Sequence, residues 1–264
     1  EATFDGRPAL GSGGSSPGVG TAAKFWAANV GTETSGSVLN PANQNMLAAI
    51  KPTVGRISRH GVIPITADQD TPGPLAKSVT DAAILLGVLE GAAPDPADPA
   101  TKLCTPPPGR DYTRFLHREG LKGARIGVPR AYYFDGGLNA AQKKVMAEAI
   151  AVMKQQGAVM VDPTDIPSVV SEDPQDSLPR WNTCTTGKGH DADCSTVFKY
   201  GMKRDFNQWL ASLGPAAPVK TLTELRHFNL AHRAAGAIKY GQSLLDVSDE
   251  MDLEAARPRY QADR

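Results

Sequence analysis

Serine hydroxyls on two glycine-rich stretches are the groups in this chain with the clearest chemical potential. The first stretch reads GGSSPG over residues 13–18, and the second reads GTETSGS over residues 31–37. Glycine lets the backbone take positive φ values and approach a ligand closely, and consecutive N–H groups in such turns form a partly positive nest. An exposed hydroxyl beside such donors is what acyl transfer requires, because the donors stabilise a developing oxyanion.

Four further blocks follow the serine stretches. They read KPTVGRISR, HGVIP, DTPGP and SVTDAA, at residues 51–59, 60–64, 70–74 and 78–83. Together, in this order, the blocks resemble the amidase signature family of serine hydrolases over about residues 13–91, and the later chain is similar to its peptide-amidase-like branch. The resemblance implies an α/β fold with a mixed, twisted sheet flanked by helices on both faces.

The resemblance also implies a Ser–cis-Ser–Lys arrangement, with Ser37 as the nucleophile and Ser15 as the bridging serine. In the family, a neutral lysine draws a proton through a bridging serine whose preceding peptide bond is cis. Such a bond costs ~3–4 kcal/mol, so the surrounding structure must enforce it. Pro17 departs from the family pattern, and Ser16 and Ser12 therefore stay as alternatives for the bridge.

Backbone N–H groups of the second serine stretch would hold the oxyanion. The resemblance places these donors on Thr34, Ser35, Gly36 and Ser37, and Ser35 stands where the family commonly has glycine. In well-studied acyl-transfer enzymes, loss of one such donor lowers the rate by about 10²–10³.

The base that activates the nucleophile is not assigned within the chain. In the family the lysine lies well upstream of the first serine stretch, whereas only fourteen residues precede Ser15. Lys24 falls in a predicted helix and Lys51 in the KPT block, where a structural or solvated role is the commoner one. We therefore expect a piece of a longer amidase, shortened at both ends.

Other kinds of site are less well supported by the sequence. None of the five histidines lies in a recognisable triad context, and the chain has no Gly-x-Ser-x-Gly elbow. Residues 190–194 read HDADC, which is not an established metal-ligand spacing, so we expect no metal and no cofactor. For Asp70, Arg56 and Arg59, a structural role in the loops around the site and a substrate contact both stay open.

The composition is that of an ordinary globular protein of 264 residues, with 41% hydrophobic and 21% charged residues. Lys and Arg number 28, as do Asp and Glu, so no global field favours nucleic acid or an anionic membrane. No apolar run reaches the ~20 residues that a membrane span needs. The expected partner is a small-molecule amide substrate, and a homodimer is left open.

Cysteine usage gives a weak indication of compartment. Cys184 and Cys194 bracket a polar loop and could pair in an oxidising compartment. The usual compartment bias favours free thiols or buried small residues. A cytoplasmic location is therefore favoured, with periplasmic and secreted locations as alternatives.

We expect one amidase-signature domain with three parts. Residues 1–91 form the signature core with the serine turns, and residues 92–123 form a proline-rich connection. Residues 124–264 form a βαβ unit and a helical region around the substrate cleft. The βαβ unit rests on a strand at 124–129, a helix at 140–156 that ends before glycine, and a strand at 159–161.

Further elements are predicted from periodicity and capping residues. A helix is expected at 21–29, a hairpin-like excursion at 57–65, and a break in regular structure at 72–74. Ser78 with Asp81 is typical of a capped helix start, and the apolar helix that follows is expected to be largely buried. Toward the C-terminus, helices are expected at 197–213, after Thr221 and at 244–254, with a polar tail beyond.

These features together predict an amide hydrolase that works through a seryl acyl-enzyme and releases ammonia or an amine. One alternative is the amide-cleaving component of a glutamine-dependent tRNA amidotransferase. The other is a non-catalytic remnant that lacks the lysine.

Overall fold

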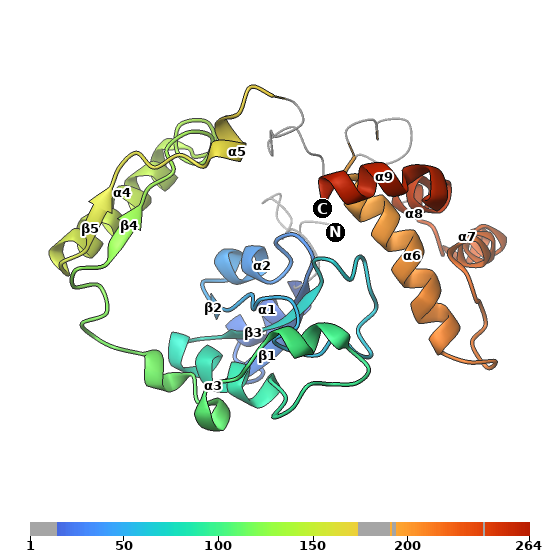
Figure 1. Cartoon of the computed structure of the whole chain (residues 1–264), viewed down its shortest axis with the longest axis horizontal. Coiled ribbons are helices and arrows are strands. Elements are labelled where there is room, and N and C mark those ends of the chain that lie inside the picture. The colour runs from blue at the N-terminus through green and yellow to red at the C-terminus, as the bar shows by residue number, and fades with distance from the viewer. Residues whose placement is uncertain (1–14, 174–190, 192–193, 240) are drawn as a thin grey trace. The chain divides into compact units, whose positions relative to one another are not determined.

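The computed structural model describes residues 15–173, 191, 194–239 and 241–264 (Figure 1). The chain forms two compact units, one of Glu1–Thr113 with Thr183–Arg264 and one of Arg114–Asn182. Both contain helices and strands, which confirms the α/β class. Among the described helices, none is long and apolar enough to cross a membrane.

A three-stranded antiparallel sheet lies at the centre of the first unit, in the order β1-β3-β2 (Figure 1). β1 (Ala28–Glu33) pairs along its whole length with β3 (Thr71–Ala76), so that Glu33 lies opposite Thr71. β2 (Ala48–Ala49) pairs only with the last two residues of β3. Every residue of β3 is buried, so this strand is the core on which the neighbouring elements pack.

The predicted break at residues 72–74 is wrong, because the prolines Pro72 and Pro74 lie inside β3. Proline removes a ladder donor and is normally confined to strand edges. Here β2 pairs with β3 only at Leu75 and Ala76. Beyond these two residues, Pro74 contributes only its carbonyl, which accepts the Ile50 N–H at 3.1 Å. The N–H groups that the two prolines lack therefore fall outside the β2–β3 pairing, and the strand tolerates them.

Helix α1 (Ser15–Ala22) precedes β1 and corrects the helix predicted at 21–29. The chain leaves the helix at Lys24, whose φ of +66° is left-handed. Trp26 Nε1 then donates to Thr21 Oγ1 at 2.8 Å, and Thr21 Oγ1 donates to the Pro17 carbonyl at 2.7 Å. These bonds fold residues 24–26 back on α1 and leave residues 28–30 free to start the strand.

Two short helices border the sheet. α2 (Leu39–Gln44) contributes Ala42 to a small core with Val38 and Leu75. α3 (Val79–Leu89) begins as predicted, with Ser78 Oγ accepting the Asp81 N–H. Its expected burial is only partly right, because its buried residues are Ala82, Ala83, Leu86 and Gly87, whereas Val79, Ile84 and Val88 are more than half exposed.

The proline-rich connection after α3 packs against the loop that precedes β3. It contains three 3-10 turns, η1 (Pro99–Leu103), η2 (Pro108–Arg110) and η3 (Thr113–Phe115). A Cβ on Gly55 would lie 2.2 Å from the Ala100 carbonyl oxygen, so only glycine permits this approach. The residues predicted as a hairpin, 57–65, form loop and turn instead. They bond to this connection, for example through Ser58 Oγ to Asp95, and the Val62 N–H donates to the Arg59 carbonyl within a turn.

Within the described residues, four helices follow in the first unit, drawn orange to red in Figure 1. They are α6 (Thr196–Ser212), α7 (Leu222–Ala231), α8 (Ser243–Asp249) and α9 (Leu253–Asp263), with a 3-10 turn η5 (Arg233–Ala235) after α7. The Thr221 cap is confirmed. The helix expected at 244–254 is two helices, since Asp252 caps a new one that includes the predicted polar tail. Their cores centre on Val197, Tyr200 and Tyr260, and on Phe206, Leu210 and Leu222.

The second unit is the predicted βαβ arrangement. β4 (Arg125–Gly127) and β5 (Val159–Val161) are parallel, and α4 (Ala140–Gln155) connects them. Asn139 and Gln142 form a capping box at the start of α4, and Gly157 has a φ of +88° just after its end. A short helix, α5 (Pro167–Val170), follows β5.

The cysteines differ from the favoured prediction at one position. Cys104 is a free thiol, whereas Cys194 is disulfide-bonded, so the favoured prediction is wrong for Cys194. Cys184 lies outside the described residues.

Candidate active site

The turn that carries Ser37 joins the end of β1 to the start of α2. Strand pairing extends to Glu33, so only residues 34–37 of the second serine stretch form the turn. Gly36 has a φ of +97°, which is left-handed and strained for any other residue. The Gly36 carbonyl accepts the Asn40 N–H at 2.7 Å. The turn therefore leads directly into the first helical bonds of α2.

Glu33 closes this turn from the strand side. Its side chain is only 4% exposed, and Oε2 accepts the N–H groups of Val38 at 2.8 Å and Leu39 at 3.0 Å. These are N-terminal amides of α2, which lack partners within the helix. A carboxylate at a helix N-terminus is also favoured by the helix dipole. Sequence analysis assigned Glu33 no role, since nothing but its place within the GTETSGS block distinguishes it.

Asp70 fixes the other end of the turn. Its Oδ1 accepts the Thr34 hydroxyl at 2.5 Å, and its Oδ2 accepts the N–H groups of Ile65 at 2.8 Å and Thr66 at 3.0 Å. Burial raises the pKa of the Asp70 carboxyl, although the bond from Thr34 opposes the shift. Asp70 thus has a structural role, because it links the turn to the loop before β3.

The turn leaves its own amides unused. Among the described residues, the N–H groups of Thr34, Ser35, Gly36 and Ser37 have no acceptor. Glu33 accepts the amides that follow the turn, and Asp70 accepts amides of the loop before β3. Ser37 is half-buried, and its hydroxyl has no hydrogen-bond partner within the described part of the chain. Four uncommitted donors and a free hydroxyl are what an oxyanion site with a serine nucleophile needs. Their roles in catalysis stay a prediction.

The bridging serine is less fully described. Ser15 is the first residue of α1, but its side chain, Ser12 and the peptide bond before Ser15 lie outside the described part. Ser16 is exposed. Helix α1 packs against both β1 and α2, the two elements that flank the Ser37 turn. The structure therefore brings the two serine stretches into one neighbourhood, and proton transfer between Ser15 and Ser37 stays a prediction.

The two lysines near the motifs are exposed. Lys51 Nζ donates to the Pro52 carbonyl at 3.2 Å, and Lys24 lies just beyond the end of α1. Neither is assigned as the base. Within the described residues, no three His, Cys, Asp or Glu side chains are grouped to hold a metal ion. Most of the HDADC segment lies outside those residues.

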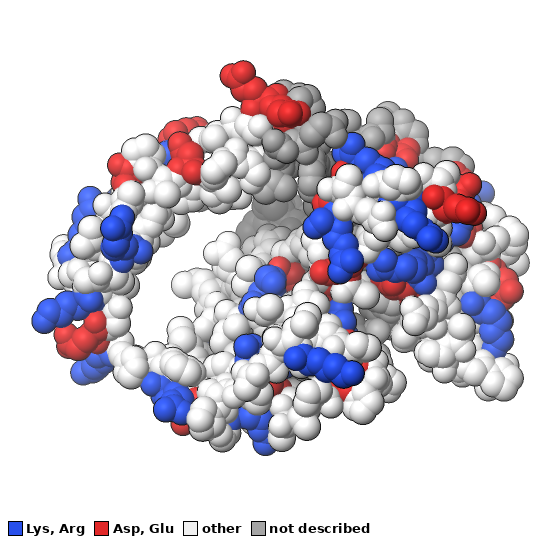
Figure 2. Space-filling model, viewed as in Figure 1, with Lys and Arg blue, Asp and Glu red and all other residues white. Residues whose placement is uncertain are grey.

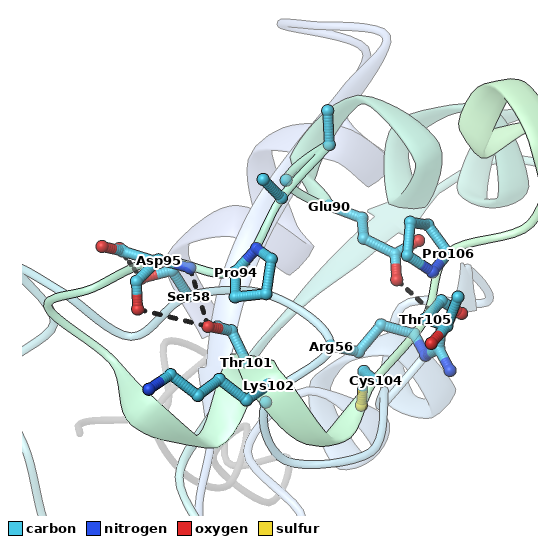
Figure 3. A pocket seen from close by; sticks show the side chains of 14 residues that line it. Arg56, Ser58, Glu90, Pro94, Asp95, Thr101, Lys102, Cys104, Thr105 and Pro106 are labelled. Carbon is cyan, nitrogen blue, oxygen red and sulfur yellow. Dashed lines mark hydrogen bonds and ion pairs between the residues drawn. The ribbon is translucent and has the colours of Figure 1, made fainter.

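Arg56 and Arg59 brace the loops around the site. Arg56 Nη1 donates to Glu90 Oε1 and to the Tyr112 hydroxyl, both at 2.7 Å. Arg56 and Glu90 line a cavity of about 250 Å³ (Figure 3). Burial, with a hydrogen bond to Glu90, raises the pKa of Tyr112 to about 12. Arg59 binds both oxygens of Asp98, through Nη2 at 2.5 Å and Nε at 2.8 Å.

The acidic partners of these arginines were not singled out in the sequence. Glu90 and Asp98 are 2% and 4% exposed. Hydrogen bonding to Arg59, opposed by burial, lowers the pKa of Asp98. Both lie in or beside the proline-rich connection, where the composition alone suggested a surface segment. The one sequence signal for these carboxylates is the pair of arginines in the KPTVGRISR block, which need acidic partners if they are buried.

A larger cavity, which we call the α6 cavity, lies next to Asp70. Its volume is about 610 Å³, and its walls come from the loop at 59–70, from residues 97–99 and from α6. Helix α6 contributes the polar and aromatic side chains of Asp205, Gln208 and Trp209 to this wall. Ser37 is not among the residues that line it, but Asp70 both lines this cavity and accepts the hydroxyl of Thr34 in the serine turn.

Comparison with known proteins gives consistent matches. The family model for Amidase matches residues 7–193, well over half of the chain. A glutamyl-tRNA(Gln) amidotransferase subunit of Trichlorobacter lovleyi is 43% identical over 155 residues, 59% of this chain and 30% of that protein. A putative amidase of Arthroderma benhamiae is 43% identical over 157 residues, covering 59% of this chain and 26% of that protein.

Among solved structures, the native peptide amidase of Stenotrophomonas maltophilia matches with a TM-score of 0.74 and 32% identity. The match covers 94% of this chain and 45% of that one. The chain therefore spans less than half the length of the relatives it matches.

Proposed function

Because the chain belongs to the Amidase family, we propose that its protein hydrolyses a carboxylic amide through an acyl-enzyme on Ser37. Ser37 Oγ attacks the carbonyl carbon, and the C–N bond breaks as ammonia or an amine leaves with a proton. Water then hydrolyses the ester to a carboxylate and restores the serine. The amides of residues 34–37 would stabilise the oxyanion in both steps.

One observation carries this proposal. The hydroxyl of Ser37 and the four amides beside it have no partners among the described residues, although the turn itself is fixed by Glu33 and Asp70. In a glycine–serine turn with a purely structural role, the serine hydroxyls usually hydrogen-bond to nearby backbone groups. A rigid turn with uncommitted donors is pre-organised for charge that develops in the transition state.

A fluorophosphonate probe tests the proposal. We expect the protein to be labelled, the Ser37→Ala variant to lose labelling, and the Ser35→Ala variant to keep it. Ser35 is the matched control because it lies in the same turn with an exposed side chain. Equal labelling of the wild type and Ser37→Ala would exclude Ser37 as the nucleophile. No labelling of any form, alongside a labelled reference hydrolase, would favour a non-catalytic protein.

A second candidate function shares the same chemistry. The similarity to a glutamyl-tRNA(Gln) amidotransferase favours glutamine as the amide, with ammonia passed to a partner protein. Free hydrolysis of small amides by the protein alone supports the first function. Glutamine hydrolysis that requires a partner and its tRNA substrate supports the second.

A further inference from the structure

We propose that the α6 cavity binds the cationic side chain of a basic amide substrate, such as the guanidinium of an arginine amide. The inference rests on the proposed function, because it assigns a substrate class to the same site. The cavity has three features that bear on this substrate: the charges of its wall, its aromatic and apolar groups, and its link to the serine turn.

The wall of the cavity has an excess of negative charge. Asp70, Asp98 and Asp205 line it, each less than 8% exposed, whereas Arg59 is the one Lys or Arg among its described lining residues. Arg59 is already bound to both oxygens of Asp98. Asp205 accepts from Arg204, at 2.6 Å and 2.9 Å, and from the Ala67 N–H.

Asp70 differs from these paired carboxylates. It accepts hydrogen bonds only from a hydroxyl and two backbone amides within the described residues. Neutral donors stabilise the carboxylate without cancelling its charge, so the wall stays negative beside Asp70. Arg59 acts on Asp70 only through space, because its guanidinium is hydrogen-bonded to Asp98. An anionic ligand would be repelled beside Asp70, while a ligand cation could pair with it directly.

The remaining walls suit the rest of a long basic side chain. Trp209 lines the cavity and is held in place by stacking on Phe206, with ring centroids 5.5 Å apart. An indole ring attracts a guanidinium or ammonium through its π face. Val62, Pro64 and Leu213 also line the cavity and can cover the methylene stem, which long basic side chains bury along apolar surface.

The side chain of Asp70 links the cavity to the turn that carries Ser37. Asp70 lines the cavity and accepts the hydroxyl of Thr34, which is three residues before Ser37. A volume of about 610 Å³ is within the usual range for small-molecule sites. An amide held at Ser37 could therefore place its neighbouring side chain in the cavity.

The test compares N-acetyl-arginine amide with N-acetyl-citrulline amide, which has almost the same shape but no charge. We expect kcat/KM to be roughly tenfold higher for the arginine amide, as one buried charge interaction with an aromatic contact suggests. Gln208 is an exposed lining residue on α6, and its substitution is not expected to affect folding. Gln208→Lys should abolish the preference, and Gln208→Glu should increase it.

Ala211→Lys is the matched control, because Ala211 is exposed on the same helix but does not line the cavity. It should leave the preference unchanged. Equal kcat/KM values for the two amides, or the same loss of preference in Ala211→Lys and Gln208→Lys, would overturn the proposal.

Calorimetry on the Ser37→Ala variant separates this inference from the proposed function. Tighter binding of the arginine amide than of the citrulline amide would support the cavity assignment even if neither compound is hydrolysed. Equal binding of the two amides would overturn the cavity assignment. If the wild type nevertheless hydrolyses both amides, the proposed function stands.

Discussion

Buried carboxylates stabilise two regions of the first unit in different ways. Around the Ser37 turn, Glu33 and Asp70 accept only backbone N–H and hydroxyl donors among the described residues. In the loops at 56–112, Glu90 and Asp98 accept from arginines instead. The difference shows how the turn can be rigid while its own amides stay available, since Glu33 binds the amides that follow the turn and Asp70 binds the Thr34 hydroxyl within it.

The two regions also differ in electrostatics. Burial raises the pKa of Asp70, whereas hydrogen bonding to Arg59 lowers that of Asp98. The face seen in Figure 2 shows Lys and Arg interspersed with Asp and Glu, in keeping with equal numbers of both signs. Within this balanced background, the serine turn is a local site where negative charge is not neutralised by a bonded cation.

The largest effect is expected in the arginine-paired region. Asp98→Ala leaves the Arg59 guanidinium without its carboxylate, and breaking such a buried pair typically costs about 3–5 kcal/mol. We expect a loss near that size in the free energy of unfolding, measured by urea denaturation. Lys144→Ala is the control, because its pair with Glu148 is exposed and should contribute little. Similar losses in both variants would contradict the contrast between the regions.

In the serine turn, Thr34→Val should have a smaller effect on stability and a larger one on reactivity. It removes the hydroxyl that Asp70 accepts and leaves a buried carboxylate oxygen without that donor, at a cost of about 1–3 kcal/mol. Labelling by the fluorophosphonate probe should slow because the turn is less well fixed. Thr34→Ser keeps the hydroxyl and should behave as the wild type. Unchanged labelling in Thr34→Val would show that Asp70 does not position the turn.

Gly36→Ala tests the turn backbone. A Cβ there meets no atom within 4 Å, so the cost comes from the positive φ alone and should be about 1–2 kcal/mol. Gly214→Ala is matched, with a φ of +75° and equally open surroundings outside the turn. Both should lose similar stability, but only Gly36→Ala should slow labelling. Equal labelling rates would argue against a role for the Gly36 amide.

The smallest effect is a pH dependence of opposite sign in the two regions. The lowered pKa of Asp98 means that its stabilisation is present above the unfolded pKa of ~3.9 and is lost as pH falls through the folded value. The raised pKa of Asp70 means that its protonated form is favoured in the fold, so stability falls as pH rises from ~3.9 through the folded value. Urea denaturation between pH 3 and 7 measures both.

Comparison of each variant with the wild type separates the two carboxylates. The stability advantage of the wild type over Asp98→Asn, measured as the free energy of unfolding, should shrink as the pH falls. The corresponding difference between wild type and Asp70→Asn should move in favour of the wild type as the pH falls. Parallel pH profiles for the two variants would contradict the assignment of opposite pKa shifts.

Sequence patterns predicted the second unit well because local and tertiary preferences agree there. The helix expected at 140–156 and the glycine at 157 point to the same βαβ unit, and in the structure Asn139 caps that helix. In the first unit, tertiary packing overrides local preference. Two prolines lie in β3, and the residues expected to extend a helix to 29 instead enter β1, because Lys24 turns the chain and Thr21 bonds Trp26.

For the candidate site, motifs located the turn but not the groups that hold it. The resemblance to the family singles out Ser37, the amides beside it and Asp70, and their catalytic roles stay predictions. Glu33 and Asp98 were not, since their roles depend on donors that are distant in sequence or on backbone amides that no pattern marks. The α6 cavity combines residues about 140 positions apart, such as Ala67 and Asp205, and no local pattern encodes that contact.

The most direct test of the central claim is acid quenching of the protein during turnover of an amide, followed by mass spectrometry of its peptides. The account predicts an added mass equal to that of the acyl group less one hydrogen on the peptide that contains Ser37, localised to that serine and absent from Ser37→Ala. An acyl group on a different residue, or amide turnover that persists in Ser37→Ala, would contradict it.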